Sequence, residues 1–328
     1  MQTNPHLDSS QLTDDAQVHE PPNIIKLWVQ ATRAPFFTAT IIPILLGSML
    51  AWVRFDTFNV VFLLIALVAG VLLHAGTNLI NDYFDHLSGA DEVNRFFSPF
   101  NGGSRVIQEG LMTPSMVKKS AFLFFSVGAS LGLLLEFLVG GWVIFTILVL
   151  GLFLAIFYTA APIRTAHHGL GEFTVFVGYG PLLVLVSWFA QSHSYDLVFP
   201  LFWSVIPGIL VGQILLINEF PDVDADAYAD KRTMVVRLSK KTSMYFFHFN
   251  IVLVYVWLIF GSIFYWDQAI LALLALASIP IALKALGNLR ANYQSNTDIL
   301  PTNALTVQLH LAIGVLMIFG LGLGKVFL

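Results

Sequence analysis

Two segments of this sequence place carboxylates and amides at the spacing of one helical face. In the first segment, four polar residues stand at positions i, i+3, i+4 and i+7: Asn78, Asn81, Asp82 and Asp85. Residues at these positions share one side of a helix. Gly89 allows the helix to end, so that Asp91 can turn back toward the same side. We therefore expect a stripe of amide and carboxylate oxygens at the end of an apolar helix.

The second segment repeats this pattern. Three of its polar residues follow each other at intervals of four: Asn218, Asp222 and Asp226. They would also share one helical face, and Pro221, which has no backbone N–H, is expected to kink the helix. Two basic residues, Lys231 and Arg232, come shortly after the acids. The repeated order of Asn followed by spaced Asp residues indicates a common role for both segments.

These residue types favour the binding of a hard cation. Clustered carboxylates repel each other, and removing them from water at a membrane boundary is costly unless a positive charge neutralises them. Ligand sets made only of oxygen suit Mg²⁺, which binds a few carboxylates and completes its coordination with phosphate oxygens. Basic side chains beside the acids would hold the remaining phosphate charge. The two segments therefore predict a Mg²⁺-bound diphosphate between two helix ends.

The elements that must position these residues are transmembrane helices. The chain has 328 residues, of which 57% are hydrophobic and only 11% charged, whereas soluble domains average about 25% charged residues. So little charge cannot cover a water-facing surface, which excludes a soluble globular enzyme. The long apolar runs match helices that span a bilayer, and they lack the alternating polarity of barrel strands. We predict an all-α, polytopic membrane protein.

Breaks at Pro, Gly and charged residues divide the chain into nine apolar segments: 25–53, 57–85, 115–138, 141–161, 169–191, 199–220, 243–265, 268–287 and 303–327. With the N-terminus in the cytoplasm, fourteen of the 16 basic residues lie on the cytoplasmic side, and only Arg54 and Lys325 lie on the other. Cytoplasmic connections are enriched in Lys and Arg. We therefore expect both acidic segments at the cytoplasmic face and the C-terminus on the opposite side.

The remaining composition narrows the class of protein further. Residues 1–22 are polar and acidic and lack the basic start and apolar core of a signal peptide. We interpret them as a disordered tail, followed by a single transmembrane domain over residues 23–328. Cysteine is absent, which excludes disulfides and thiolate metal sites. The net charge of −4 argues against nucleic acid as a partner, and no obligate protein partner is indicated.

The pattern Asn81-Asp82-x-x-Asp85-x-x-x-Gly89-x-Asp91 resembles the first acidic motif of the UbiA superfamily of intramembrane aromatic prenyltransferases. Asp222-x-x-x-Asp226, followed by Lys231-Arg232-Thr233, resembles the second. The spacing of the first motif and the segments 32–35, 102–110 and 158–172 are similar to the 1,4-dihydroxy-2-naphthoate branch. Residues 219–221 depart from the pattern, because several relatives carry Asn or Arg there. This departure affects the expected phosphate contacts.

The resemblance implies nine transmembrane helices around a central cavity, in a bacterial cytoplasmic membrane. It implies transfer of a polyprenyl chain from its diphosphate to an aromatic acceptor, and for this branch a role in menaquinone biosynthesis. Five aspartates would hold Mg²⁺: Asp82, Asp85, Asp91, Asp222 and Asp226. Asp85, Asp222 and Tyr158 would act in catalysis, Tyr158 by offering π-electrons to an allylic cation. Seven residues would contact the substrates: Arg33, Asn78, Asn81, Arg105, Asn218, Lys231 and Arg232.

Three other interpretations stay open. A prenyltransferase could use a 4-hydroxybenzoate, haem or chlorophyll type of acceptor. A secondary transporter also has intramembrane acids and broken helices, but its site lies near the bilayer midplane, whereas both acidic segments here are expected at one face. A non-catalytic scaffold would not need aspartates paired at helical spacing. No residue stands out as a catalytic base, and we interpret His74, one turn before Asn78, as structural.

Overall fold

The described chain is a bundle of long helices. The computed structural model describes residues 23–328, so the predicted tail over residues 1–22 lies outside the described part. Within that part the secondary structure is helical, without strands, as predicted. Eight helical segments in it are long and apolar enough to cross a membrane. They are formed by η2 (Ala34–Phe37) with α2 (Thr38–Phe55), α3 (Val60–Ser88), α5 (Pro114–Val139), α7 (Gly171–Val177) with η4 (Gly178–Leu182) and α8 (Leu183–Ser192), α9 (Val198–Tyr228), α11 (Lys240–Phe260) with η5 (Gly261–Tyr265), η6 (Asp267–Ser278) with α12 (Ile279–Asn292), and α13 (Leu300–Phe327).

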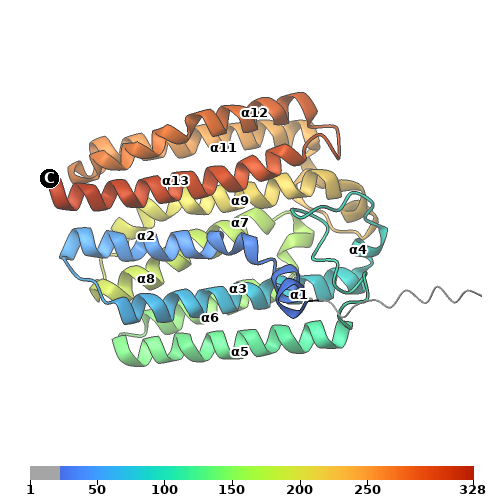
Figure 1. The fold of residues 1–328 in the computed structure, drawn as a ribbon, viewed down its shortest axis with the longest axis horizontal. Helices are drawn as coiled ribbons and strands as arrows, with labels where there is room; N and C mark the ends of the chain where they lie inside the picture. Colours follow the sequence, from blue (N-terminus) through green and yellow to red (C-terminus); the bar gives the residue numbers. More distant parts are fainter. Residues whose placement is uncertain (1–22) are drawn as a thin grey trace, which may run out of the picture.

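The predicted segment 141–161 corresponds to a shorter apolar helix, α6 (Val143–Phe157), of 15 residues. It lies within the same bundle, beside α3 and α5 (Figure 1). Each of the nine predicted apolar segments therefore has a helical counterpart in the described chain, but α6 is too short to meet the length expected of a membrane span.

The first predicted segment, 25–53, is wrong in one respect, because it contains two helices that run in different directions. The short α1 (Ile24–Ala31) is seen end-on in Figure 1 and crosses one end of the bundle. Arg33 then adopts a left-handed conformation with φ 51°, and Pro35 stands at the start of η2. A left-handed residue and a residue without a backbone N–H interrupt a continuous helix. This break places Arg33 at the end of the bundle.

Proline inside the other helices is accommodated in two ways. The helix α9 runs through Pro207 and Pro221 without ending, and it carries Asp222 and Asp226 on its last turns. By contrast, α7 and α8 are joined by one wider turn, η4, which contains Pro181. A proline in a helix removes one i→i−4 hydrogen bond, and a π-type turn is one way to accommodate the gap.

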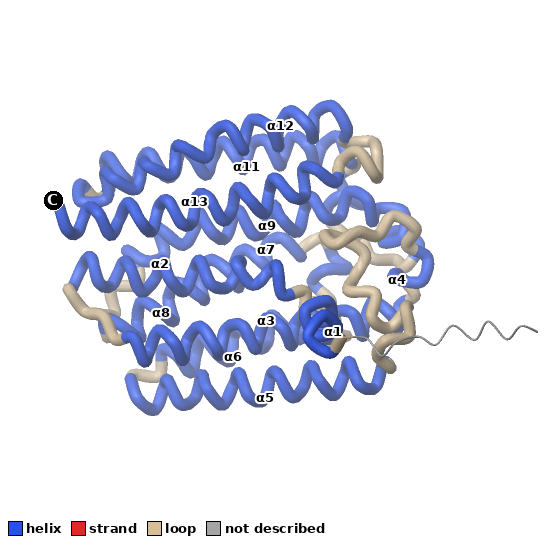
Figure 2. Tube along the Cα trace, in the orientation of Figure 1, coloured by secondary structure: helices blue, strands red, loops and turns tan. Residues whose placement is uncertain are grey.

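Small residues allow close packing between α3 and α5, which lie side by side along their length (Figure 2). A Cβ atom added to Gly76 would lie 2.9 Å from the ring of Phe125, and one added to Gly128 would lie 2.9 Å from Leu73. Neither glycine could be replaced without moving its neighbour, so both have a packing role. Close contact of this kind is the usual means by which transmembrane helices associate.

The irregular parts that form the site lie at one end of the bundle. Helix α3 ends at Gly89, which has φ 77°, and the short α4 (Ala90–Val93) follows directly. Figure 1 shows α1, α4 and the loop 94–113 together at this end, while the C-terminus lies at the other. The expected turn at Gly89 is therefore present, and it brings Asp91 back toward the end of α3.

Candidate active site

Asp82 is paired with a positive charge supplied by the break after α1. The Arg33 guanidinium donates to Asp82 Oδ1, and the backbone N–H of Ser104 donates to Oδ2 at 3.3 Å. Burial alone would lower the pKa of Arg33, but the carboxylates of Asp82 and Asp91 raise it above its usual value. Because Arg33 already neutralises Asp82, this contact favours a positioning role for Asp82 over the predicted role of metal ligand. Asp82 instead holds the α1–η2 turn and the loop in place.

Lys231 lies between the two acidic segments. Its Nζ is 3.2 Å from Asp85 Oδ2 on α3 and 3.5 Å from Asp226 Oδ1 on α9. Burial alone would lower the pKa of Lys231, but Asp226 and Asp85 reverse this effect and raise the pKa well above its usual value. The ammonium group is therefore charged. The two segments meet, as predicted, and the ammonium group of Lys231 lies between them.

The single ammonium group does not satisfy all the buried acids. Asp85 Oδ1 and Asp91 Oδ2 are buried without a hydrogen-bond partner in the described chain. The pKa of Asp91 is raised to about 8, mainly by burial and to a lesser extent by the negative charges of Asp85 and Asp82. Buried carboxylate oxygens without donors indicate a site that lacks positive charge. A divalent cation with a preference for oxygen would supply it.

The carboxylates do not form a complete metal site on their own. Within residues 23–328, no three His, Cys, Asp or Glu side chains converge closely enough to hold one metal ion. Mg²⁺ commonly binds one or two protein carboxylates and takes its other ligands from water and substrate phosphates. The residues present therefore fit Mg²⁺ as a partial ligand set, which the oxygens of a bound phosphate compound would complete.

Asp222 anchors the loop between α4 and α5. The side-chain amides of Asn94 and Asn101 donate to its Oδ1 at 2.8 and 2.5 Å, and the backbone N–H of Gly102 donates to its Oδ2 at 3.1 Å. None of these donors carries a charge, so Asp222, unlike Asp82, is held in place by neutral groups. Asn94 and Asn101 were not predicted from the sequence to be functional residues. Two amides in a glycine-containing loop beside an acidic motif were the available signal.

The same loop closes over the first acidic segment through Gly103. This residue has φ +75°, and a Cβ atom placed on it would lie 2.8 Å from Asp91 Oδ2. Only glycine combines this conformation with such a close approach. Arg105, two residues after Gly103, donates from its guanidinium to the backbone carbonyl of Asp91 and stacks 4.5 Å above the ring of Phe97. Arg105 therefore reaches the predicted site, where it binds the backbone of the acidic motif.

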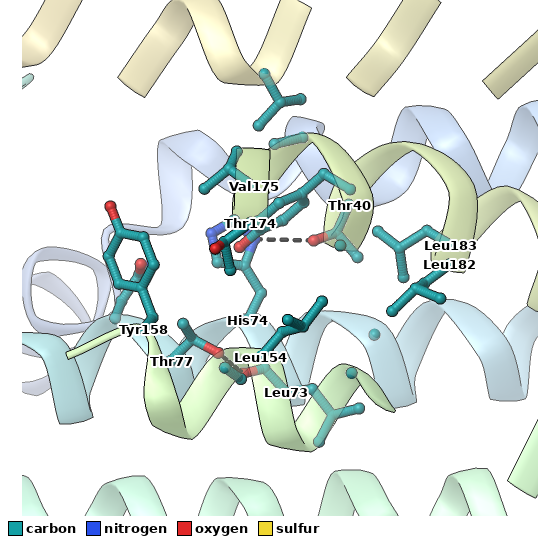
Figure 3. A pocket seen from close by; sticks show the side chains of 18 of the residues that line it. Thr40, Leu73, His74, Thr77, Leu154, Tyr158, Thr174, Val175, Leu182 and Leu183 are labelled. Carbon is teal, nitrogen blue, oxygen red and sulfur yellow. Dashed lines mark hydrogen bonds between the residues drawn. The ribbon is translucent and has the colours of Figure 1, made fainter. Parts of the chain in front are cut away.

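A cavity of about 280 Å³ lies next to the acidic residues inside the bundle. Five of the predicted site residues line it: Arg33, Asn78, Asn81, Tyr158 and Asn218. The rest of its wall is mostly apolar, and in Figure 3 Tyr158 lies on one side of the view while Leu182 and Leu183 lie on the other. The cavity thus combines a polar part near the carboxylates with an apolar part suited to a hydrocarbon chain.

The polar residues of the cavity wall are held by neighbouring helices. Asn78 donates to the carbonyl of Thr32 at 2.8 Å, and Asn218 accepts from the side chain of Asn303 at 2.8 Å. Tyr158 follows directly after α6, and burial is the main reason that the pKa of its phenol is raised well above its usual value. Tyr158 therefore presents a neutral aromatic ring to the cavity.

Arg232 does not join the site. Its side chain is 62% exposed and forms a 3.1 Å ion pair with Asp230 at the surface, so the structure does not agree with the prediction that it contacts substrate.

The departure from the family pattern at Glu219 has a local explanation. Its Oε2 accepts from the backbone N–H of Val235 at 3.3 Å, which ties α9 to the short α10 (Met234–Leu238). Glu219 is thus used for packing and is not among the residues that line the cavity.

Comparison with known proteins places this arrangement in a family. Residues 40–300 match the UbiA prenyltransferase family. The 2-carboxy-1,4-naphthoquinone phytyltransferase of Synechocystis sp. is 28% identical over 92% of this chain and 94% of its own. The 1,4-dihydroxy-2-naphthoate octaprenyltransferase of Mycobacterium tuberculosis is 33% identical over 64% of this chain and 69% of its own.

The solved structures support the fold. A UbiA homolog from Archaeoglobus fulgidus bound to GPP and Mg²⁺ superimposes with a TM-score of 0.60 over 89% of this chain and 99% of its own. Its sequence identity of 11% limits the comparison to the arrangement of the helices.

Proposed function

This chain belongs to the UbiA prenyltransferase family, and we propose that it transfers a polyprenyl chain from polyprenyl diphosphate to 1,4-dihydroxy-2-naphthoate. The observation that carries the proposal is the contact of Lys231 with both Asp85 and Asp226 beside an apolar cavity. Carboxylates from two helices there surround a single ammonium group, and buried oxygens remain without partners. Such a site is suited to a cation and a diphosphate, with the hydrocarbon chain in the apolar part of the cavity.

We choose the aromatic acceptor from the substrates that are named for two similar proteins. The names of the Synechocystis and Mycobacterium tuberculosis proteins both refer to a carboxylated naphthalene ring. The first of these aligns with nearly the whole of this chain. A naphthoate is therefore the acceptor that we propose, and the product would be a precursor of menaquinone.

The side chains can perform three tasks in this reaction. Mg²⁺ held by Asp85, Asp91, Asp222 and Asp226 would supply positive charge to the departing diphosphate. Lys231, which is charged and lies between Asp85 and Asp226, would donate hydrogen bonds to phosphate oxygens. Tyr158 would place its π-electrons near the allylic carbon as positive charge develops there. The apolar wall excludes water, which would otherwise capture the allylic cation.

The orientation in the membrane follows from the distribution of charge. The protein is an integral membrane protein, and we propose that the end with α1, α4 and Lys231 faces the cytoplasm of a bacterial cell. Basic residues gather at that end, as they do in cytoplasmic connections generally. The soluble aromatic acceptor would then reach the site from the cytoplasm, while the polyprenyl chain would enter from the bilayer.

The direct test is prenyl transfer by the purified protein in nanodiscs, with Mg²⁺, geranylgeranyl diphosphate and a panel of aromatic acceptors. We expect a prenylated naphthalene product by mass spectrometry, at a kcat/KM at least about tenfold above that for 4-hydroxybenzoate, because a pocket shaped for one ring system discriminates by this order. The variant Lys118→Ala, remote from the cavity, should behave like the wild type. A higher kcat/KM with 4-hydroxybenzoate would reassign the acceptor, and the absence of any prenylated product would overturn the proposed function.

A further inference from the structure

The cavity contains a polar pair that the diphosphate site does not use. Thr40 on α2 and His74 on α3 are hydrogen-bonded across the cavity wall, with 2.8 Å between Thr40 Oγ1 and His74 Nδ1 (Figure 3). Both residues are buried in the protein, at 1% and 7% exposure. His74 stands one helical turn before Asn78, so it lies farther from the carboxylates, toward the apolar part of the cavity.

The imidazole is held in a fixed orientation. Its ring packs edge-on against Phe37 and Tyr179, with centroid distances of 5.3 and 4.9 Å. Two aromatic contacts and one hydrogen bond leave the ring little freedom to rotate. A rigidly held polar group can select a ligand by the position of one atom, which a mobile group cannot do.

The hydrogen bond to Thr40 also determines which ring nitrogen carries the proton. His74 Nδ1 is the one hydrogen-bond partner of the Thr40 hydroxyl within the described chain. If the Thr40 hydroxyl accepted a hydrogen bond from a protonated Nδ1, its own buried O–H would have no acceptor, which is unfavourable. The hydroxyl therefore donates to Nδ1, and the neutral imidazole carries its proton on Nε2. No residue of the described chain is hydrogen-bonded to Nε2, so this N–H is available to a ligand.

The other threonine hydroxyls of the cavity wall are already engaged. Thr77 donates to the carbonyl of Leu73 at 2.8 Å, and Thr174 donates to the carbonyl of Leu170 at 2.9 Å. Both bonds lie within their own helices, so these donors are not available to a ligand. His74 is thus distinguished from these threonines by an N–H group that has no partner in the described chain.

We propose that His74 donates a hydrogen bond from Nε2 to a hydroxyl oxygen on the ring of the aromatic acceptor, and that Thr40 fixes the tautomer that makes this bond possible. The assignment rests on the proposed function. A neutral donor in apolar surroundings suits a neutral ring oxygen, whereas a carboxylate would need a charged partner. Because His74 lies between the polar and the apolar parts of the cavity, this bond would hold the ring where the two substrates meet.

The first arm of the test compares His74→Phe with His74→Gln. Phe keeps a planar ring but removes the N–H group, and Gln restores an amide donor. We expect His74→Phe to raise the KM for the acceptor about tenfold, the usual effect of one lost hydrogen bond, with the KM for the diphosphate changed less than about twofold. Gln should recover part of the loss. An unchanged acceptor KM in His74→Phe would overturn the proposal.

The second arm tests the role of the hydroxyl with a matched pair of variants. Thr40→Val removes the group that fixes the tautomer, and Thr77→Val removes a hydroxyl of the same cavity that bonds within its own helix. We expect a rise of about threefold in the acceptor KM for Thr40→Val, and no change for Thr77→Val. Equal effects of the two substitutions would contradict the role assigned to Thr40.

The third arm identifies the oxygen and separates the two proposals. Binding of 1,4-dihydroxy-2-naphthoate, and of its two analogues that each lack one ring hydroxyl, is measured by calorimetry without diphosphate. In the wild type, one deletion should weaken binding about tenfold, and in His74→Phe the same deletion should have no further effect. Equal penalties in both proteins would overturn the assignment of His74, whether or not prenyl transfer occurs. Absence of transfer by the wild type would overturn only the proposed function.

Discussion

Replacing Asp85 by Asn is expected to lower the kcat of prenyl transfer by about 10³-fold, the order lost when a group that stabilises transition-state charge is removed. Asp85 is buried, one of its oxygens contacts Lys231, and the other has no hydrogen-bond partner in the described chain. The substitution keeps the shape of the side chain and removes its charge, so the site would hold the cation and diphosphate less well. The effect is measured as the rate of product formation with Mg²⁺ in excess and with both substrates about tenfold above their KM values.

A matched control separates this effect from a general change in charge at the same end of the bundle. Glu92, in α4, is 40% exposed at its side chain and pairs with His86. Glu92→Gln should leave kcat within about twofold of the wild type, because exposed ion pairs contribute little. A similar loss of activity in Glu92→Gln, or a loss of less than about tenfold in Asp85→Asn, would contradict the role of Asp85.

Asp222→Ala is expected to reduce activity by about 10³-fold and to release the loop 94–113 at the same time. Its carboxylate receives hydrogen bonds from Asn94, Asn101 and Gly102, so its removal leaves those donors without their partner. Trypsin should then cleave after Arg95, an exposed residue of this loop, faster than it does in the wild type. Activity and the rate of this cleavage measure the two effects separately.

Two further variants, Asp222→Asn and Asp224→Asn, separate the loss of charge from the release of the loop. Asn retains one oxygen that can accept from the loop, so Asp222→Asn should lose activity while its loop is cleaved more slowly than that of Asp222→Ala. Asp224 is exposed on the same helix, and its substitution should change neither quantity. Full activity in Asp222→Asn would show that the charge of Asp222 is not needed and would contradict its assignment as a metal ligand.

The meeting of Asp85 and Asp226 could be predicted from the sequence because it depends on two regular features. Helical spacing places each acid on a polar face, and the alternation of apolar segments places both helix ends on one side of the membrane. These rules need no knowledge of tertiary structure. The position of Lys231 shortly after the acids also predicted that it would take part, although as a phosphate ligand and not as a bridge between carboxylates.

The roles of Asp82 and of the loop could not be predicted in the same way. Helical spacing alone cannot distinguish Asp82 from Asp85, because both lie on the polar face of α3. The difference arises from Arg33, which reaches Asp82 only because the chain turns out of the helix after α1. The hydrogen bonds from Asn94 and Asn101 to Asp222 connect residues more than 120 positions apart. The loop that makes them also contains Gly102 and Gly103 in left-handed conformations, which local sequence rules do not specify.

The most direct measurement uses Mn²⁺ as a spectroscopic substitute for Mg²⁺, in electron paramagnetic resonance of the wild type and of Asp85→Asn with Asp226→Asn. The two acidic segments are proposed to hold one cation together with a diphosphate. We expect the wild type to bind Mn²⁺ tightly only when geranyl diphosphate is present, with ³¹P hyperfine coupling that reports metal–phosphate contact, and the double variant to lose this signal. Equal Mn²⁺ binding by both proteins, or bound Mn²⁺ without ³¹P coupling, would contradict a metal–diphosphate site between α3 and α9.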